Sequence, residues 1–341
     1  MSQTAFAIVP PRPASDAGLH WSFVPQQAAL RFARLGEPMK RMVGEDGPDQ
    51  NPRPWLARAN LAARAAMPSL TRSLAHARTD RQPVIVVRGL PVDPSPPATP
   101  YDGIVDPAAS SRSVINLHAV AAALGLHPIA YAGESASILH AVCPVRTAWG
   151  EASSHGFDTA LPFHTDYADR PIDVAEAGQS PSAAALIFAV ERAEPTIPME
   201  FIPLRRLLEA LTPAQIHSGR QAEFAVRAPA IFRGGQVMRT RPLFLSDGRG
   251  RLNLGRMTGI TARAAALLDD LRAILTDDAM VTRIPVRRGD IVVIDNQRAI
   301  HRRAAFTPRW DGTDRYFIRM SAVPDPARGI AFDSNRPWIW S

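Results

Sequence analysis

The sequence predicts one β-rich domain with flanking helices. Short apolar runs of strand length occur at 281–286, 291–294 and 315–323, and turn-forming residues separate them. Helical patterns do not alternate regularly with these runs, which disfavours a doubly wound parallel sheet. The chain has 341 residues, of which 46% are hydrophobic, so it is long enough to bury a substantial core. We therefore treat residues 1–341 as a single domain.

The N-terminal part of this domain gives weaker patterns. Residues 1–55 are rich in proline and turn formers and show no clear period, which predicts an irregular arm. Residues 60–76 suit a helix that breaks near Pro68, because proline removes a helical hydrogen bond. Residues 83–87 form an apolar run typical of a buried strand, and a proline-rich loop is expected over 93–111.

The middle of the chain contains recognisable helix starts. Ser113 is expected to cap a helix, and 179–190 is expected to contain a buried strand. Thr212 and Gln215 have the spacing of a capping box, with proline at the first helical position. The clearest helix opens at Thr261, where leucines recur at helical spacing.

Cysteine usage and hydropathy restrict the class of protein. The single cysteine, Cys143, excludes an intramolecular disulfide framework and a cysteine-rich metal site. No apolar run approaches the roughly 18 residues that span a bilayer. The N-terminus lacks the basic region of a secretory signal. These features predict a cytoplasmic protein without a membrane partner.

The positive charge does not indicate a nucleic-acid partner. Lys and Arg together number 39, Lys40 is the only lysine, and the formal net charge is +7. The arginines are scattered among 32 acids, and no block of like charge occurs. A phosphate-binding G-x-x-x-x-G-K loop is also absent from the sequence.

One histidine has an acid two residues later, in His164-Thr165-Asp166. With nine histidines and 32 acids, about one such pair is expected by chance, so the pair alone carries little weight. On a strand, however, residues i and i+2 project from the same face and can reach one cation. With a distant histidine, for which His301 is the candidate, they would complete a facial triad for non-haem Fe(II).

Two arginines follow His301 in an apolar run. Arg315 and Arg319 are four residues apart, so on a strand they share one face. Buried arginines on one face are uncommon unless they bind carboxylates. The alternative is that both are solvated on an edge strand.

Three segments, LPFHTDYA, RRGDIVVIDNQRAIHRR and DGTDRYFIRM, stand in the same order as in a known family. The sequence resembles the Fe(II)- and 2-oxoglutarate-dependent dioxygenases of the clavaminate-synthase-like group, within the wider taurine-dioxygenase superfamily. The resemblance runs from about Pro83 to about Pro324. It implies a double-stranded β-helix, or jelly roll, over about 83–324, flanked by helices, with a C-terminal tail over 325–341.

The resemblance also implies ligands for iron and for the cosubstrate. Iron would be bound by His164, Asp166 and His301, although this group usually has glutamate at the position of Asp166. The distal carboxylate of 2-oxoglutarate would be bound by Arg315. Thr196 would also touch 2-oxoglutarate, if an insertion precedes it, and O2 is the second cosubstrate.

The implied substrate is a small carboxylate, such as a free amino acid or a derivative in specialised metabolism. Arg319 would bind its carboxylate, Ser154 would contact it, and Glu134 is a candidate for binding its amine. The implied reaction is hydroxylation, with desaturation and cyclisation also known for this fold.

The stretch GRGRLNLGRMTG indicates which side chain the substrate has. It offers Asn253 but no acid, and it contains Arg251 and Arg256. A cationic side chain buried there without a counter-charge would cost several kcal/mol. A polar neutral or acidic side chain is therefore favoured, unless Glu134, Asp169 or Asp173 supplies a carboxylate.

Two other functions remain open from the residues alone. A metal-dependent hydrolase or isomerase on a cupin-like barrel would use the same triad but would not need Arg315. A non-catalytic binding protein on a decayed dioxygenase fold would not need an intact triad.

Overall fold

The computed structural model describes residues 18–43, 47–228 and 238–341. In these ranges the α-helices are α1 (Gln26–Leu35), α2 (Glu37–Met42), α3 (Pro52–Ala66), α4 (Pro68–Thr79), α5 (Ser111–Ala123), α6 (Leu204–Glu209), α7 (Pro213–Gly219) and α8 (Ala262–Ile274). The strands are β1 (Leu19–Phe23), β2 (Val84–Arg88), β3 (His127–Tyr131), β4 (Leu139–Val142), β5 (Leu161–His164), β6 (Ala185–Arg192), β7 (Met199–Pro203), β8 (Phe224–Arg227), β9 (Met238–Arg241), β10 (Met257–Gly259), β11 (Thr282–Ile284), β12 (Ile291–Asp295), β13 (Ala299–Arg303), β14 (Tyr316–Val323), β15 (Ala331–Asp333) and β16 (Arg336–Trp340).

Two sheets form a jelly roll. The larger sheet has the order β1-β2-β12-β6-β14-β3-β16-β15, with β4 also paired to β14, and the smaller one has the order β11-β7-β13-β5. One hydrophobic cluster joins them, with Val292 and Phe317 from the larger sheet and Phe201 from the smaller one. The double-stranded β-helix implied by the family resemblance is confirmed. A third sheet, β10-β8-β9, lies outside this pair.

Strands of the larger sheet are apolar on both faces, because helices cover its outer face. In β12, Val292 belongs to the cluster between the sheets, whereas Ile291 and Val293 belong to the cluster that contains the helices. The same period of two holds in β14, where Phe317 faces the interior and Ile318 the helices. This alternation explains the continuous apolar runs in the sequence.

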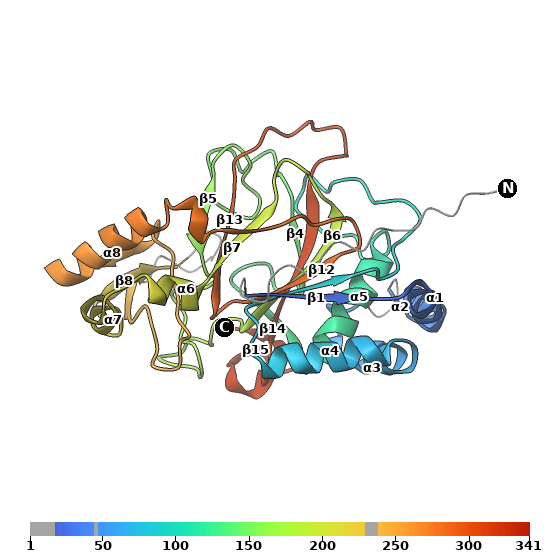
Figure 1. Cartoon of the computed structure of the whole chain (residues 1–341). Coiled ribbons are helices and arrows are strands. Elements are labelled where there is room, and N and C mark those ends of the chain that lie inside the picture. Colours follow the sequence, from blue (N-terminus) through green and yellow to red (C-terminus); the bar gives the residue numbers. More distant parts are fainter. Residues whose placement is uncertain (1–17, 44–46, 229–237) are drawn as a thin grey trace.

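The helices gather at two ends of the molecule. Figure 1 shows α1 to α5 together on one side of the molecule and α7 and α8 on the other. The second group packs on the smaller sheet through a separate cluster that includes Leu207, Phe224, Leu268 and Ile300. No helix within the described ranges has both the length and the apolar character required to cross a bilayer.

The prediction of an irregular arm over 1–55 is wrong for its described part. Strand β1 pairs in parallel with β2, and α1, α2 and the start of α3 follow it. Residues 1–17 lie outside the described residues. Two of the prolines that suggested irregular structure stand at helix starts: Pro38 and Pro52 occupy the first or second helical position, where their missing N–H costs nothing.

The C-terminal segment 325–341 is also more ordered than predicted. Strand β16 pairs in parallel with β3, and Trp340 is buried, so this segment extends the larger sheet. The expected break near Pro68 is confirmed, because α3 ends at Ala66 and α4 begins at Pro68. The capping box of Thr212 is present, whereas α5 begins at Ser111, two residues before the predicted cap.

Candidate metal centre and substrate cavity

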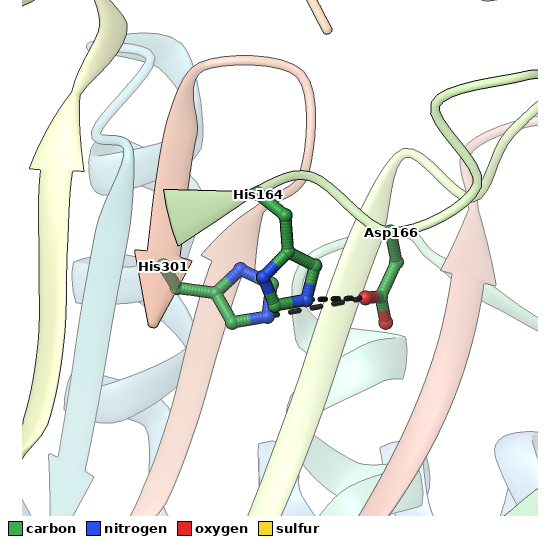
Figure 2. Close-up of side chains that lie close together, drawn as sticks. All are labelled: His164, Asp166 and His301. Carbon is green, nitrogen blue, oxygen red and sulfur yellow. Dashed lines mark hydrogen bonds and ion pairs between the residues drawn. The ribbon is translucent and has the colours of Figure 1, made fainter. Parts of the chain in front are cut away.

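Two histidines face each other across neighbouring strands of the smaller sheet. His164 is the last residue of β5, and it pairs directly with His301 of β13 in the antiparallel register. Their ring centroids are 4.3 Å apart, and Figure 2 shows both rings turned toward the carboxylate of Asp166. The strand register thus brings together two imidazoles that are far apart in the sequence.

The strand expected to carry both His164 and Asp166 does not include Asp166. Strand β5 ends at His164, and Asp166 stands in the loop that follows. The buried side chain of Asn296 fixes this loop. Its Oδ1 accepts a hydrogen bond from the Asp166 N–H at 2.8 Å, and its Nδ2 donates to the Asp166 carbonyl at 2.9 Å. The carboxylate therefore reaches the histidines because two hydrogen bonds between Asn296 and the Asp166 backbone hold the loop, and not because of strand geometry.

The surroundings of these three side chains suit metal ligation. The Nδ1 of His164 lies 2.8 Å from the Pro162 carbonyl, an arrangement that turns its Nε2 toward the carboxylate of Asp166. Burial, with the neighbouring His164, lowers the pKa of His301 to about 3, so its imidazole is neutral. Burial would raise the pKa of Asp166, but Arg319 and His164 outweigh it and hold that pKa well below its usual range.

These ligand atoms fit one divalent ion. The Nε2 of His164 and Oδ1 of Asp166 are 3.1 Å apart, the Nε2 of His301 is 4.0 Å from the same oxygen, and one ligand atom from each residue lies within 4.8 Å of the others. Two imidazoles and one carboxylate form the donor set of the facial triad, which leaves other metal positions open. Aspartate in place of the group's usual glutamate is thus compatible with the site.

Arg319 links the metal ligands to a second acid. It is buried on β14 and donates to Oδ2 of Asp166 at 2.8 Å and to Oε1 of Glu134 at 2.5 Å. Tyr167, whose φ is +57°, donates its hydroxyl to Glu134 at 2.8 Å. His140 also lies beside this acid, because its Nδ1 is 3.8 Å from Oε1 of Glu134.

A cavity of about 500 Å³ contains the three candidate ligands together with Glu134, Ser154, Asn253, Arg315 and Arg319. Ser154 bonds to Nε2 of His140 at 2.8 Å. Asn253 forms an isolated bridge with His164, which places it beside the metal ligands. Arg315 and Arg319 share the inner face of the larger sheet with Phe317, in agreement with their spacing of four.

Arg315 is a buried cation without a carboxylate partner among the described residues. Its guanidinium lies 3.9 Å from the Phe317 ring centroid, and its Nε has no hydrogen-bond partner in this part of the chain. Burial, with a smaller contribution from Arg303, lowers the pKa of Arg315 to about 9. A carboxylate from a bound ligand would offset the free-energy cost of burying the Arg315 cation. The position of Arg315 therefore fits an anionic cosubstrate.

Thr196 does not join these residues. It is exposed in the loop between β6 and β7, where its hydroxyl donates to Glu194 at 3.3 Å, and it is not part of the cavity wall. The role expected for Thr196 depended on an assumed insertion before it, and the position of this threonine in an exposed loop does not support that role.

Arg303 and Asn296 are site residues that the sequence argument missed. Arg303 is buried on β13 and donates to the carbonyls of Thr159 at 3.0 Å and Ala304 at 2.9 Å, so it fixes the cavity wall near Arg315. Its partners are backbone atoms, which leave no pattern in the sequence. The only signal for Asn296 in the sequence was the change from apolar to polar residues after the run 291–294, which precedes His301.

The comparisons with known proteins agree with this geometry. The family model for the taurine catabolism dioxygenase TauD, TfdA family matches residues 192–321. The chain is 31% identical to L-asparagine oxygenase of Streptomyces coelicolor, over 81% of this chain and 82% of the relative. It is 30% identical to clavaminate synthase 2 of Streptomyces clavuligerus, over 69% and 72% of the two chains. The crystal structure of an asparagine oxygenase with Fe(II), 2S,3S-3-hydroxyasparagine and succinate superposes with a TM-score of 0.79 at 26% identity, over 94% of this chain and 99% of that one.

Loss of any candidate ligand should abolish metal binding. We expect His164→Ala, Asp166→Ala and His301→Ala each to lower the affinity for Fe(II) by about 100-fold or more, since even residues that only orient a ligand contribute about 10–100-fold. Anaerobic titration calorimetry measures this, and circular dichroism shows whether the fold is retained. His76→Ala, on the exposed face of α4, is the control. Full affinity in any one of the three variants would remove that residue from the triad.

Arg315→Lys should weaken the binding of 2-oxoglutarate. Lysine keeps the charge but cannot form two parallel hydrogen bonds to a carboxylate, so we expect the half-saturating 2-oxoglutarate concentration to rise about tenfold or more. Succinate release at varied 2-oxoglutarate measures the change. Arg309→Lys, at an arginine that pairs with Glu194 near the surface, is the matched control. An unchanged half-saturation in Arg315→Lys would rule out its role.

Proposed function

The chain belongs to the TauD/TfdA family of Fe(II)- and 2-oxoglutarate-dependent dioxygenases, and from this premise we propose that it hydroxylates a free α-amino acid whose side chain is polar and neutral or acidic. The observation that carries the proposal is the pairing of Arg319 with Glu134 in the cavity of the candidate metal ligands. An α-amino acid carries one negative and one positive group, and these two side chains offer the opposite charges side by side.

His164, Asp166 and His301 would hold the iron. When bound, Fe(II) with 2-oxoglutarate and O2 supplies the oxidising power to hydroxylate an unactivated C–H bond. Arg315 would fix the cosubstrate through its distal carboxylate, since it is the buried cavity arginine with neither a carboxylate nor a backbone carbonyl partner among the described residues. Thr196 has no part in this proposal.

The amino-acid head group would bind where the charges of Arg319 and Glu134 meet. The substrate ammonium would replace part of the Arg319 contact with Glu134, and the substrate carboxylate would take the guanidinium edge at Nε, which has no partner among the described residues. Ser154 would also contact the substrate, held by its bond to His140, which pairs with Arg319 across β4 and β14. Burial, with the nearby Arg319, lowers the pKa of His140 to about 3, so this histidine stays neutral.

The side chain would then extend past the metal toward Asn253. Of the other acids considered as counter-charges, Asp173 pairs with Arg249 away from the cavity, at 2.6 Å. Asp169 does line the cavity, but Arg227 and Arg256 line it as well. Two arginines against one aspartate make this part of the cavity positive. A neutral or acidic substrate side chain is therefore favoured over that of arginine or lysine.

The second and third functions considered from the sequence lose their support. A hydrolase or isomerase would leave the buried charge of Arg315 without a use, and the chain belongs to a dioxygenase family. A decayed binding protein would not be expected to keep three ligand atoms within 4.8 Å of one another.

A panel of L-amino acids tests the proposal. With Fe(II) and 2-oxoglutarate, we expect polar neutral or acidic amino acids to accelerate succinate release and to gain one oxygen atom, while L-arginine and L-lysine remain inert. Asn253→Ala should raise the KM for the accepted amino acid about tenfold with little change for 2-oxoglutarate, because one hydrogen-bonding group of the cavity is lost. Asn335→Ala, in an exposed turn, is the control.

Two results would contradict the proposal in different ways. Efficient coupled turnover of L-arginine or L-lysine, with neutral and acidic amino acids inert, would refute the side-chain preference. Succinate release that no amino acid accelerates would refute the assignment of a free amino acid as substrate.

A further inference from the structure

The cavity wall contains more positive charge than the proposed reaction uses. Arg319 pairs with two acids, and Arg302 pairs with Glu200 at 2.6 Å. Arg303 donates to backbone carbonyls, and Arg315 is proposed to bind 2-oxoglutarate. Two cavity arginines remain that have no carboxylate partner in the described part of the chain: Arg227 and Arg256.

These two arginines are neighbours at one end of the cavity. Arg227 ends β8 and Arg256 directly precedes β10, and the Arg227 N–H donates to the Arg256 carbonyl at 2.9 Å. Arg256 is half-buried, and its guanidinium donates to the Ala228 carbonyl at 3.1 Å. Burial, followed by the positive charge of Arg227, lowers the pKa of Arg256, as expected for like charges held together.

Acids near this end do not neutralise the pair. Asp169 is buried in the same wall, but its Oδ2 accepts a hydrogen bond from the Gln179 amide at 2.9 Å, and a single carboxylate faces two guanidinium groups. The other acid nearby, Glu176, already pairs with Arg241. Two cations against one acid leave this end of the cavity positive.

A short turn connects this end to the metal ligands. Asn253 forms a bridge with His164, and the Arg256 N–H donates to the Asn253 carbonyl at 2.9 Å. The wall therefore runs from the metal ligands through Asn253 to Arg256 and Arg227. A substrate whose α-carbon end lies at Arg319 and Glu134 would direct the far end of its side chain along this wall.

We propose that Arg227 and Arg256 form an anion subsite that binds the side-chain carboxylate of a dicarboxylic amino acid. This inference rests on the proposed function and narrows it from polar side chains in general to acidic ones. Two guanidinium groups can give a carboxylate several charge-assisted hydrogen bonds, whereas the corresponding amide would place an NH2 group against two cations.

Matched acid and amide pairs of amino acids test the subsite: L-aspartate with L-asparagine, L-glutamate with L-glutamine, and L-2-aminoadipate as the longer acid. We expect one of the acids to have a higher kcat/KM than every amide in the wild-type enzyme.

Arg256→Gln should lower kcat/KM for that acid about tenfold or more and change the value for its amide less than about twofold, since one charge-assisted hydrogen bond is lost. Arg227→Gln should act in the same direction. Arg272→Gln, on the exposed face of α8, is the control.

The possible failures are distinguishable. An amide that is preferred by the wild type, or an Arg256→Gln variant that affects acid and amide equally, would overturn the subsite while leaving amino-acid hydroxylation intact. An equal loss on both substrates with a lowered melting temperature would assign Arg256 a structural role beside Asp169, which also overturns it. A wild-type enzyme in which no amino acid accelerates succinate release would refute the proposed function itself.

Discussion

One buried guanidinium holds the two halves of the site together. Arg319 is 7% exposed and donates to Asp166, a candidate metal ligand, and to Glu134, the proposed partner of the substrate amine. None of these charges could be buried alone without a large cost, so each requires the others. The proposed sites for the metal and for the substrate head group are thereby positioned relative to the same residue of β14, and Arg319 helps to keep the pKa of Asp166 well below its usual range.

The sheets supply the remaining positions through their period of two and their register. Odd-numbered residues of β14, Arg319 among them, face the interior, and Arg315, directly before this strand, lines the same cavity. The pairing of β13 with β5 sets His301 opposite His164. The end of β12 supplies Asn296, which fixes the loop of Asp166. The proposed chemistry thus depends on strands, whereas the residues proposed to select the side chain come from the small sheet outside the jelly roll.

The sequence predicted those features that depend on local pattern or on three ordered motifs. The shared face of Arg315 and Arg319 followed from their spacing, and the family resemblance supplied the distant His301. The helices before residue 55 were missed because their buried faces are sparse: α1 buries only Ala29 and Phe32, and α2 buries only Met39, which gives a weak apolar pattern. Strand β16 was missed because its partner β3 is about two hundred residues away, and Thr196 was misassigned because an insertion had to be guessed. The backbone partners of Arg303 and Asn296 leave no signature in their own sequence positions.

The central claim is that one cavity binds iron, 2-oxoglutarate and an amino acid together, so that O2 oxidises the amino acid while 2-oxoglutarate loses CO2. Reaction under O2 labelled with oxygen-18, followed by mass spectrometry of both products, tests this most directly. We expect one labelled oxygen in succinate and one in the new hydroxyl group of the amino acid, in equal amounts and only with Fe(II) present. An amino-acid product whose oxygen comes from water, formed without succinate, would contradict the claim.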